Sequence, residues 1–306
     1  MQILIFTPNK EILFSKEQIK SLESSGNVSW FTHTHTDFAS LKELQSPEEK
    51  IICIDPDFCD WAVPNSVFDS PNLKAVILQT TSFSWIDIDY AKSKDIPVVN
   101  LRGFSSIAVA EWVTMMVLNI ARKLPIVIKD DWKQDYTKHQ GIELRGKTAG
   151  IVGMGRIGAA IAENMAGLGM KVQYWSPSSQ NPKFDKVSLE KLMETSDVIL
   201  PAVAKNKQTE GVITDKMILS MKSTAIFVSI VHEVYNHELL LKLESENKIY
   251  GYGFESSKSE MSAHNGNVWA GPELAWCTQD SMKKNAEQWT ESIILATKGN
   301  FTNRVN

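Results

Sequence analysis

The chain has 306 residues, 43% of them hydrophobic and 22% charged, so it can bury one large core or two smaller ones. A net charge of −4 and a pI near 5.9 argue against a surface that binds nucleic acid. Three cysteines are too few for a disulfide framework, and the first apolar run is too short for a signal peptide or a membrane span. We therefore expect a cytoplasmic protein without a metal site.

The first third of the chain alternates short apolar runs with stretches long enough for helices. The runs lie at residues 3–6, 51–54, 75–78 and 98–99. This alternation predicts βα units and a parallel sheet. An apolar segment at 107–121 then predicts a buried helix that links two lobes and is too short to cross a bilayer. Three histidines among polar neighbours are predicted at the surface: His139, His237 and His264.

A glycine motif follows the apolar run at 148–152. It reads Gly153-Met154-Gly155-Arg156-Ile157-Gly158, and a helical pattern and a strand-like run at 171–175 come after it. In such a loop the first glycine permits a tight turn, the second lets the backbone approach a pyrophosphate, and the third lets the helix pack closely on the sheet. The motif in this context predicts a dinucleotide site.

The residue that usually holds the ribose is an acidic side chain at the end of the second strand. Here that strand leads into Ser176-Pro177-Ser178-Ser179, without Asp or Glu. Repulsion of a 2′-phosphate is then weaker, but no Arg stands beside the serines. NAD and NADP therefore both remain open. Further strands are predicted at 198–200, 225–228 and 249–252.

Several motifs, in order and over nearly the whole chain, resemble the D-isomer-specific 2-hydroxyacid dehydrogenase family. They are a loop at 80–87 similar to the one that binds the substrate carboxylate, the segment 91–100, the helix entry at 106–111, and the passages 196–199 and 209–213. The resemblance implies an α/β fold of two Rossmann-like or flavodoxin-like lobes with parallel sheets. The nucleotide lobe, 101–283, would be inserted into a substrate lobe of 1–100 and 284–306. It also implies an active site between the lobes and a homodimer formed through the helix near Ile107.

The positions that carry the family's chemistry differ in this chain. His232 stands where the family has a substrate-binding Arg, and Glu273 where it has an acid/base His. Glu260 fits the Glu that orients that His. Glu255 replaces an Asp near the nicotinamide. The resemblance therefore assigns His232, Glu260 and Glu273 as the catalytic candidates.

These exchanges alter the charge of the site. An imidazole cannot replace the permanent bidentate clamp of a guanidinium, and added carboxylates disfavour an anionic substrate. A neutral or cationic carbonyl or alcohol is expected instead of a simple 2-oxo acid. His232 could act as acid/base with Glu273 or Glu260 beside it, because a nearby carboxylate favours the proton-donating imidazolium. A structural ion pair between the same residues is the alternative.

The resulting hypothesis is an NAD- or NADP-dependent oxidoreductase acting on a CH–OH or carbonyl group. A non-catalytic dinucleotide-binding protein of the same fold is the alternative. Substrate contacts are expected from Thr81, Ser82 and Phe83, although Ser82 stands where the family has Gly and narrows that approach. The expected cofactor contacts are Gly153, Gly155, Arg156, Ile157, Gly158, Ser176, Val203, Val231 and Glu255.

Overall fold

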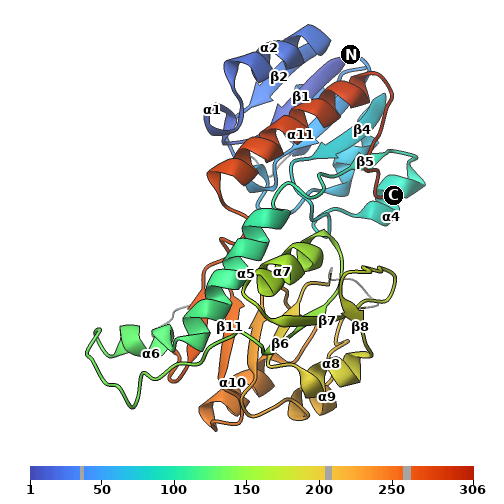
Figure 1. Ribbon diagram of the computed structural model, residues 1–306. Coiled ribbons are helices and arrows are strands. Elements are labelled where there is room, and N and C mark those ends of the chain that lie inside the picture. The colour runs from blue at the N-terminus through green and yellow to red at the C-terminus, as the bar shows by residue number, and fades with distance from the viewer. Residues whose placement is uncertain (35–37, 204–208, 258–262) are drawn as a thin grey trace. The chain divides into compact units, whose positions relative to one another are not determined.

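The computed structural model describes residues 1–34, 38–203, 209–257 and 263–306, and the chain folds into two compact units (Figure 1). The first unit combines Met1–Ser105 with Thr278–Asn306, and the second is the continuous segment Ser106–Cys277. The second unit is thus inserted into the first. The expected boundaries lie a few residues from these, and which unit holds substrate and which holds cofactor stays a prediction.

The first unit is built on a five-stranded parallel sheet in the order β2-β1-β3-β4-β5. Its strands are β1 (Gln2–Phe6), β2 (Asn27–Phe31), β3 (Lys50–Ile54), β4 (Leu73–Leu78) and β5 (Val98–Val99). Four of them confirm the predicted apolar runs. The fifth, β2, was not predicted, because this edge strand has no fully buried residue and mixes polar with apolar side chains.

Helices cover both faces of that sheet. They are α1 (Lys10–Leu13), α2 (Lys16–Ser25), α3 (Lys42–Gln45), α4 (Ile88–Ser93) and α11 (Gln279–Thr297), with 3-10 turns at Phe38–Ser40, Pro56–Phe58 and Asn65–Asp69. The C-terminal helix α11 packs Trp289, Ile293 and Ala296 into the core beside Ile3 and Ile5 of β1. The first unit therefore needs residues from both ends of the chain.

The second unit has a seven-stranded parallel sheet in the order β12-β11-β10-β9-β6-β7-β8. The strands are β6 (Thr148–Val152), β7 (Lys171–Trp175), β8 (Asp185–Lys186), β9 (Val198–Pro201), β10 (Ile226–Ser229), β11 (Gly251–Glu255) and β12 (Val268–Gly271). The order reverses between β6 and β9, which is where ligands bind in open parallel sheets. The fold class predicted from the sequence is confirmed.

One strand lies later in the chain than its predicted range of 249–252. Strand β11 begins at Gly251 and contains Gly253, so the apolar run at 249–252 predicted the strand but not its bounds. A Cβ on Gly251 would lie 2.5 Å from Ile120 Cγ2, and one on Gly253 would lie 2.8 Å from Ile120 Cδ1. The two glycines thus let the helix that carries Ile120 pack closely on the sheet.

The helices of the second unit are α5 (Ser106–Ala121), α6 (Leu124–Lys129), α7 (Arg156–Gly167), α8 (Leu189–Thr195), α9 (Asp215–Leu219) and α10 (His237–Ser245). Helices α5 and α7 share one apolar cluster with Ile151 of β6, and α8, α9 and α10 share the other with Val152. The predicted buried helix is confirmed as α5. No helix in the described ranges is long and apolar enough to cross a membrane.

Candidate functional site

The glycine loop joins β6 to α7. Gly153 has φ +104°, a conformation that favours glycine, and an added Cβ would lie 2.7 Å from Val203 Cγ1. A Cβ on Gly158 would lie 1.9 Å from the carbonyl oxygen of Gly153, so only glycine lets α7 start this close to β6. At Gly155 no atom of the described residues lies within 4 Å of the position of a Cβ. Open space at Gly155 leaves the backbone free for the approach of a ligand.

The start of α7 is available to an anion. Gly155 is its N-cap residue and provides no side-chain cap, so the first backbone N–H groups keep their donors for an external partner. Arg156 is exposed and makes no hydrogen bond or ion pair within the described parts of the chain, and Ile157 is half-buried. These residues fit the pyrophosphate of a dinucleotide. Val203 is buried behind Gly153, so it supports the shape of the loop.

The ribose end of the site follows β7. Ser176 is buried, and its Oγ accepts a hydrogen bond of 3.2 Å from the backbone N–H of Ser179. The backbone N–H of Asn181 donates to the hydroxyl oxygen of Tyr174 over 2.8 Å. Sequence reasoning missed Lys186 of β8, whose ammonium lies 3.5 Å from the carbonyl oxygen of Ser179. The pairing of β7 with β8, which the sequence did not predict, brings this cation to the serine turn.

Two of the three catalytic candidates lie near each other. His232 follows β10, Glu273 follows β12, and His232 Nε2 lies 3.8 Å from Glu273 Oε1. That is an ion-pair distance, longer than a hydrogen bond, and both side chains are about half exposed. The third candidate, Glu260, falls outside the described residues. The structure therefore brings together the residues that replace the family's Arg and His.

The backbone around His232 adopts a special conformation. The next residue, Glu233, has φ +63°, in the left-handed region that favours glycine, and glycine stands there in the resembled motif. The carbonyl oxygen of Glu233 accepts a hydrogen bond of 2.9 Å from Gly211 N–H. Before the turn, Ser229 Oγ accepts from Val231 N–H at 3.1 Å and donates to its carbonyl oxygen at 2.9 Å. Val231 is half-buried in this tight turn, which fixes where His232 leaves the sheet.

Glu255 holds the segment that carries Glu273. It ends β11, is only 5% exposed, and its Oε1 accepts hydrogen bonds of 3.0 Å from the backbone N–H groups of both Leu274 and Ala275. Burial raises the pKa of the Glu255 carboxyl to about 7, against the lowering effect of these two bonds, and the charge of Glu273 raises it further. A contact of Glu255 with the cofactor stays a prediction.

A buried hydrogen-bond chain lies next to β11. The hydroxyl of Tyr252 is 2.9 Å from that of Tyr235 and 2.7 Å from Nδ1 of His237, the first residue of α10. Burial lowers the pKa of His237 and raises that of Tyr252 well above its usual value. The surface position predicted for His237 is therefore wrong: its ring is half-buried, because it provides the partner that the buried tyrosine requires.

The predicted substrate residues lie in the first unit, in the loop after β4. Thr81, Ser82 and Phe83 are exposed, with Phe83 at 40%. Two side chains hold the backbone of the loop: Trp85 Nε1 donates to the carbonyl oxygen of Ser82 at 2.9 Å, and Asn100 Nδ2 donates to that of Thr81 at 2.7 Å. The three side chains are thus presented to solvent at the carboxyl end of a parallel strand.

A family model described as D-isomer specific 2-hydroxyacid dehydrogenase, NAD binding domain, matches residues 114–277. The chain belongs to the D-isomer-specific 2-hydroxyacid dehydrogenase family. The match covers the glycine loop, His232, Glu255 and Glu273. The resemblance read from the sequence is confirmed, and the cofactor of this 2-hydroxyacid dehydrogenase family member is a nicotinamide dinucleotide, the ligand that its glycine loop fits.

Two of the curated relatives are named glyoxylate reductases. That of Thermococcus kodakarensis is 30% identical over 259 residues, which cover 78% of each chain. That of Thermofilum pendens is 28% identical over 271 residues, covering 82% of this chain and 79% of the relative.

Solved structures share the fold over the full length of the chain. The acyclic imino acid reductase Bsp5, in complex with NADPH and D-Arg, has a TM-score of 0.85 at 24% identity, with all of both chains covered. A glyoxylate reductase from Paecilomyes thermophila has a TM-score of 0.86 at 19% identity, with 100% of this chain and 98% of that chain covered. At these identities the likeness establishes the fold.

Proposed function

We propose that the chain is a reductase that uses a nicotinamide dinucleotide to reduce a carbonyl-type carbon, with His232 as the acid/base. The observation that carries the proposal is that His232 and Glu273 lie 3.8 Å apart in the unit that also presents the glycine loop. When bound, the reduced nicotinamide supplies the hydride. The imidazolium of His232 donates a proton to the developing alkoxide oxygen, while the carboxylate of Glu273 orients the ring.

The substrate proposed is neutral or cationic. The family's Arg, a permanent cation, is replaced here by His232, and Glu273 adds a carboxylate that is about half exposed. Both changes weaken the binding of a 2-oxo acid and favour a substrate without net negative charge. Thr81, Ser82 and Phe83 are the proposed substrate contacts, because they are exposed in the loop after β4.

The relatives named glyoxylate reductase give the competing expectation, a small 2-oxo acid. Oxidation of NADH and NADPH should therefore be followed with glyoxylate, hydroxypyruvate, and panels of neutral and cationic carbonyl compounds. We expect turnover only with the latter two classes. A Michaelis constant for glyoxylate in the ordinary micromolar to millimolar range would reject the substrate proposal and leave the oxidoreductase in place.

Replacing His232 by Asn tests the acid/base assignment. His232→Asn should lower kcat by about a hundredfold or more and leave the dissociation constant of the dinucleotide unchanged, because His232 is assigned to proton transfer. Full turnover by the variant would rule out this role. If the unaltered protein turns over nothing yet binds the dinucleotide, the non-catalytic alternative holds.

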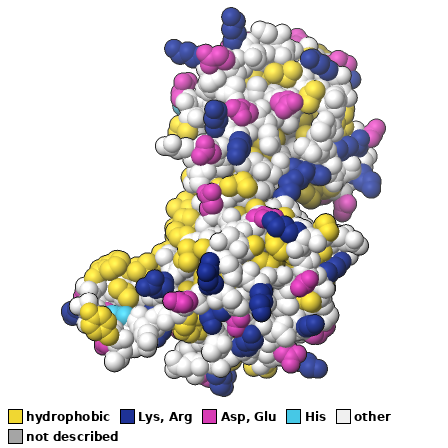
Figure 2. Space-filling model, in the orientation of Figure 1, with side chains coloured by type: hydrophobic (Ala, Val, Ile, Leu, Met, Phe, Trp, Pro, Cys, Tyr) yellow, Lys and Arg dark blue, Asp and Glu magenta, His cyan; other side chains and the backbone are white. Residues whose placement is uncertain are grey.

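We also propose that two copies associate through the second unit. Ile107 and Leu118 of α5 are 55% and 39% exposed, and Trp132 and Tyr136, which follow α6, are 67% and 81% exposed. Figure 2 shows hydrophobic side chains gathered over the projecting segment after α6. Exposed apolar side chains on a helix and on the segment that follows α6 are typical of a protein–protein interface.

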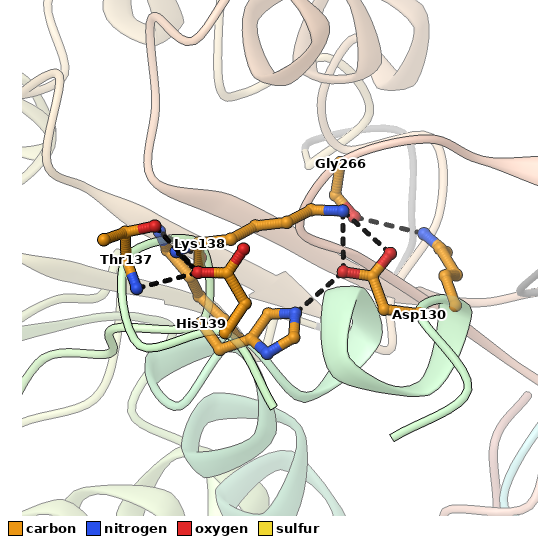
Figure 3. Close-up of polar contacts among 8 residues, drawn as sticks. Asp130, Thr137, Lys138, His139 and Gly266 are labelled. Atoms are coloured by element: carbon orange, nitrogen blue, oxygen red, sulfur yellow. Dashed lines mark hydrogen bonds and ion pairs between the residues drawn. The ribbon is translucent and has the colours of Figure 1, made fainter. Parts of the chain in front are cut away.

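The segment that follows α6, residues 130–141, is called the arm. Hydrogen bonds between its own residues hold it in one conformation. The carboxylate of Asp130 accepts from His139 Nε2 at 2.8 Å and from Lys138 Nζ at 2.7 Å (Figure 3). Asp135 accepts hydrogen bonds from the backbone N–H of Lys138 and from Thr137, and these bonds lower the pKa of its carboxyl to about 2. The surface position predicted for His139 is wrong, since its side chain is 11% exposed. A fixed arm presents its aromatic side chains without a large ordering cost on binding.

Light scattering after gel filtration tests the association. We expect twice the chain mass of 34.3 kDa, and a shift to one copy in a Trp132→Ala, Tyr136→Ala double variant. Trp61→Ala is the matched control, because Trp61 is 49% exposed in the first unit. A single-copy mass for the unaltered protein at micromolar concentration would contradict this proposal.

A further inference from the structure

Strand β8 places a cation, Lys186, beside the turn that follows β7, and no carboxylate of the described residues pairs with it. Lys186 pairs in register with Tyr174 on the neighbouring strand, and its ammonium makes one long contact of 3.5 Å with the carbonyl oxygen of Ser179. Within the described residues this is its sole polar partner. A lysine ammonium has three donors, so at least two are left for a ligand.

The neighbouring charges do not cancel Lys186. Lys183 forms an ion pair with Glu163 of α7, and that carboxylate is therefore already used. Asp185 precedes Lys186 on β8 and stands opposite Gln173, so strand alternation directs it to the other face of the sheet. The face shared by Tyr174 and Lys186 thus keeps one uncompensated positive charge.

The turn itself offers hydroxyl donors beside that charge. Ser176 is 5% exposed and its Oγ already accepts a hydrogen bond from Ser179 N–H, while no described residue accepts its hydroxyl hydrogen. Ser178 is exposed and has no polar partner among the described residues. Hydroxyl donors next to an ammonium are the groups that bind a phosphate monoester.

The place of this turn decides which phosphate it meets. In this fold the pyrophosphate lies at the start of the helix after the glycine loop, and the adenosine ribose lies at the end of the next strand, here β7. NAD has a free 2′-hydroxyl there and is normally held by a carboxylate, which this turn lacks. NADP has a phosphate at that position.

We propose that Ser176, Ser178 and Lys186 form a subsite for the 2′-phosphate, so that this protein binds NADP in preference to NAD. The inference rests on the proposed dinucleotide-dependent function and adds the choice of cofactor. In this subsite a lysine from β8 takes the place of an arginine within the loop. Recognition consists of a charge-assisted contact from Lys186 and hydroxyl hydrogen bonds from the serines.

Fluorescence titration tests the subsite without any turnover, by energy transfer from tryptophan to the bound reduced nicotinamide. We expect NADPH to bind at least about tenfold more tightly than NADH, and Lys186→Ala to remove most of that difference by weakening NADPH alone. Lys183→Ala is the matched control, an exposed lysine close in sequence whose charge is already paired. Competition by adenosine 2′,5′-bisphosphate but not by 5′-AMP should follow the same pattern.

The possible results separate the two levels of the proposal. Equal affinity for NADH and NADPH, or a Lys186→Ala variant that weakens both alike, overturns the phosphate subsite and leaves the dinucleotide function standing. Binding of neither cofactor rejects the proposed function itself. Lys186→Gln gives a second, uncharged variant, and a thermal melt confirms that each variant is folded.

Discussion

Gly153 and Gly155 lie two residues apart, and glycine has a different role at each: the backbone of the loop requires it at 153, and the proposed phosphate contact requires it at 155. Gly153 has φ +104° and no room for a Cβ, while Gly155 has an ordinary negative φ of −78° and open space. Gly153→Ala should therefore lower the free energy of unfolding by roughly 2 kcal/mol or more, through backbone strain and the clash with Val203. Urea unfolding followed by tryptophan fluorescence measures this loss.

Gly155→Ala is the matched variant for the same loop. We expect its free energy of unfolding to stay within about 0.5 kcal/mol of the parent, because no atom in the described part of the chain lies near the new methyl group. Its affinity for the dinucleotide should fall, because the methyl group occupies the path of the phosphate. The assignment of the loop to phosphate binding would be wrong if Gly155→Ala bound NADPH as tightly as the parent.

Glu255 makes the stability of the second unit depend on pH. The pKa of its carboxyl is about 7 in the folded protein, against an ordinary value of 4.5. Between pH 4.5 and pH 7 the folded state therefore keeps a proton on Glu255 that the unfolded state has released. Stability from this group is therefore fully present below about pH 4.5 and is lost as pH rises towards 7. The loss is about 3 kcal/mol in order of magnitude.

Glu255→Gln removes this titration and keeps an acceptor oxygen for Leu274 and Ala275. The variant should match the parent in stability near pH 4.5 and exceed it by up to about 3 kcal/mol at pH 8. Urea unfolding at a series of pH values provides the comparison. A difference that does not grow between pH 5 and 7.5 would show that Glu255 is ionised throughout.

At the level of single residues, the sequence predicted the site in part. The resemblance aligned His232 and Glu273 with the Arg and the His of the family. Only the structure could show that the two side chains lie 3.8 Å apart. The bonds of Glu255 to residues 274 and 275 could not be predicted, since they depend on how β11 and the segment after β12 lie together. Lys186 was missed because its position depends on the two-residue strand β8.

Helix α11, like α2, begins with a capping box, which is a local signal for the start of a helix. Thr278 accepts a hydrogen bond from Ser281 N–H at 3.1 Å and donates its own N–H to Ser281 Oγ at 3.1 Å, a capping box. Thr278→Ala should lower the free energy of unfolding of the first unit by about 1 kcal/mol. Thr278→Asn, which restores a capping side chain, should recover most of it in the same urea titration. Equal losses for both variants would show that the cap contributes little.

Whole elements could be predicted where burial made the pattern continuous. Strands β1, β3 and β6 have nearly unbroken apolar runs, because both faces of a parallel sheet are covered. The elements that escaped prediction have other constraints. Strand β2 lies at an edge and β8 has two exposed residues, whereas β11 was predicted with shifted bounds because it contains glycines required by α5.

For the molecule as a whole, the second unit is continuous in sequence and has apolar clusters on both faces of its own sheet. A fragment of residues 106–277 should therefore fold by itself and bind NADPH with a dissociation constant within about threefold of the full chain. A fragment of residues 1–105 lacks Trp289, Ile293 and Ala296 of α11 and should remain largely unfolded. Circular dichroism and fluorescence titration of the two fragments check both expectations, and a folded 1–105 fragment would contradict the second.

The closure of the first unit by α11 has a consequence for synthesis on the ribosome. The strands of that unit are made before the inserted unit, yet one face of their sheet gains Trp289 and its neighbours only after the inserted unit has been made. The inserted unit is complete earlier and can fold while translation continues. The order of folding thus reverses the order of synthesis. Until α11 is made, the apolar face of the N-terminal sheet stays uncovered, and chaperones are expected to bind there.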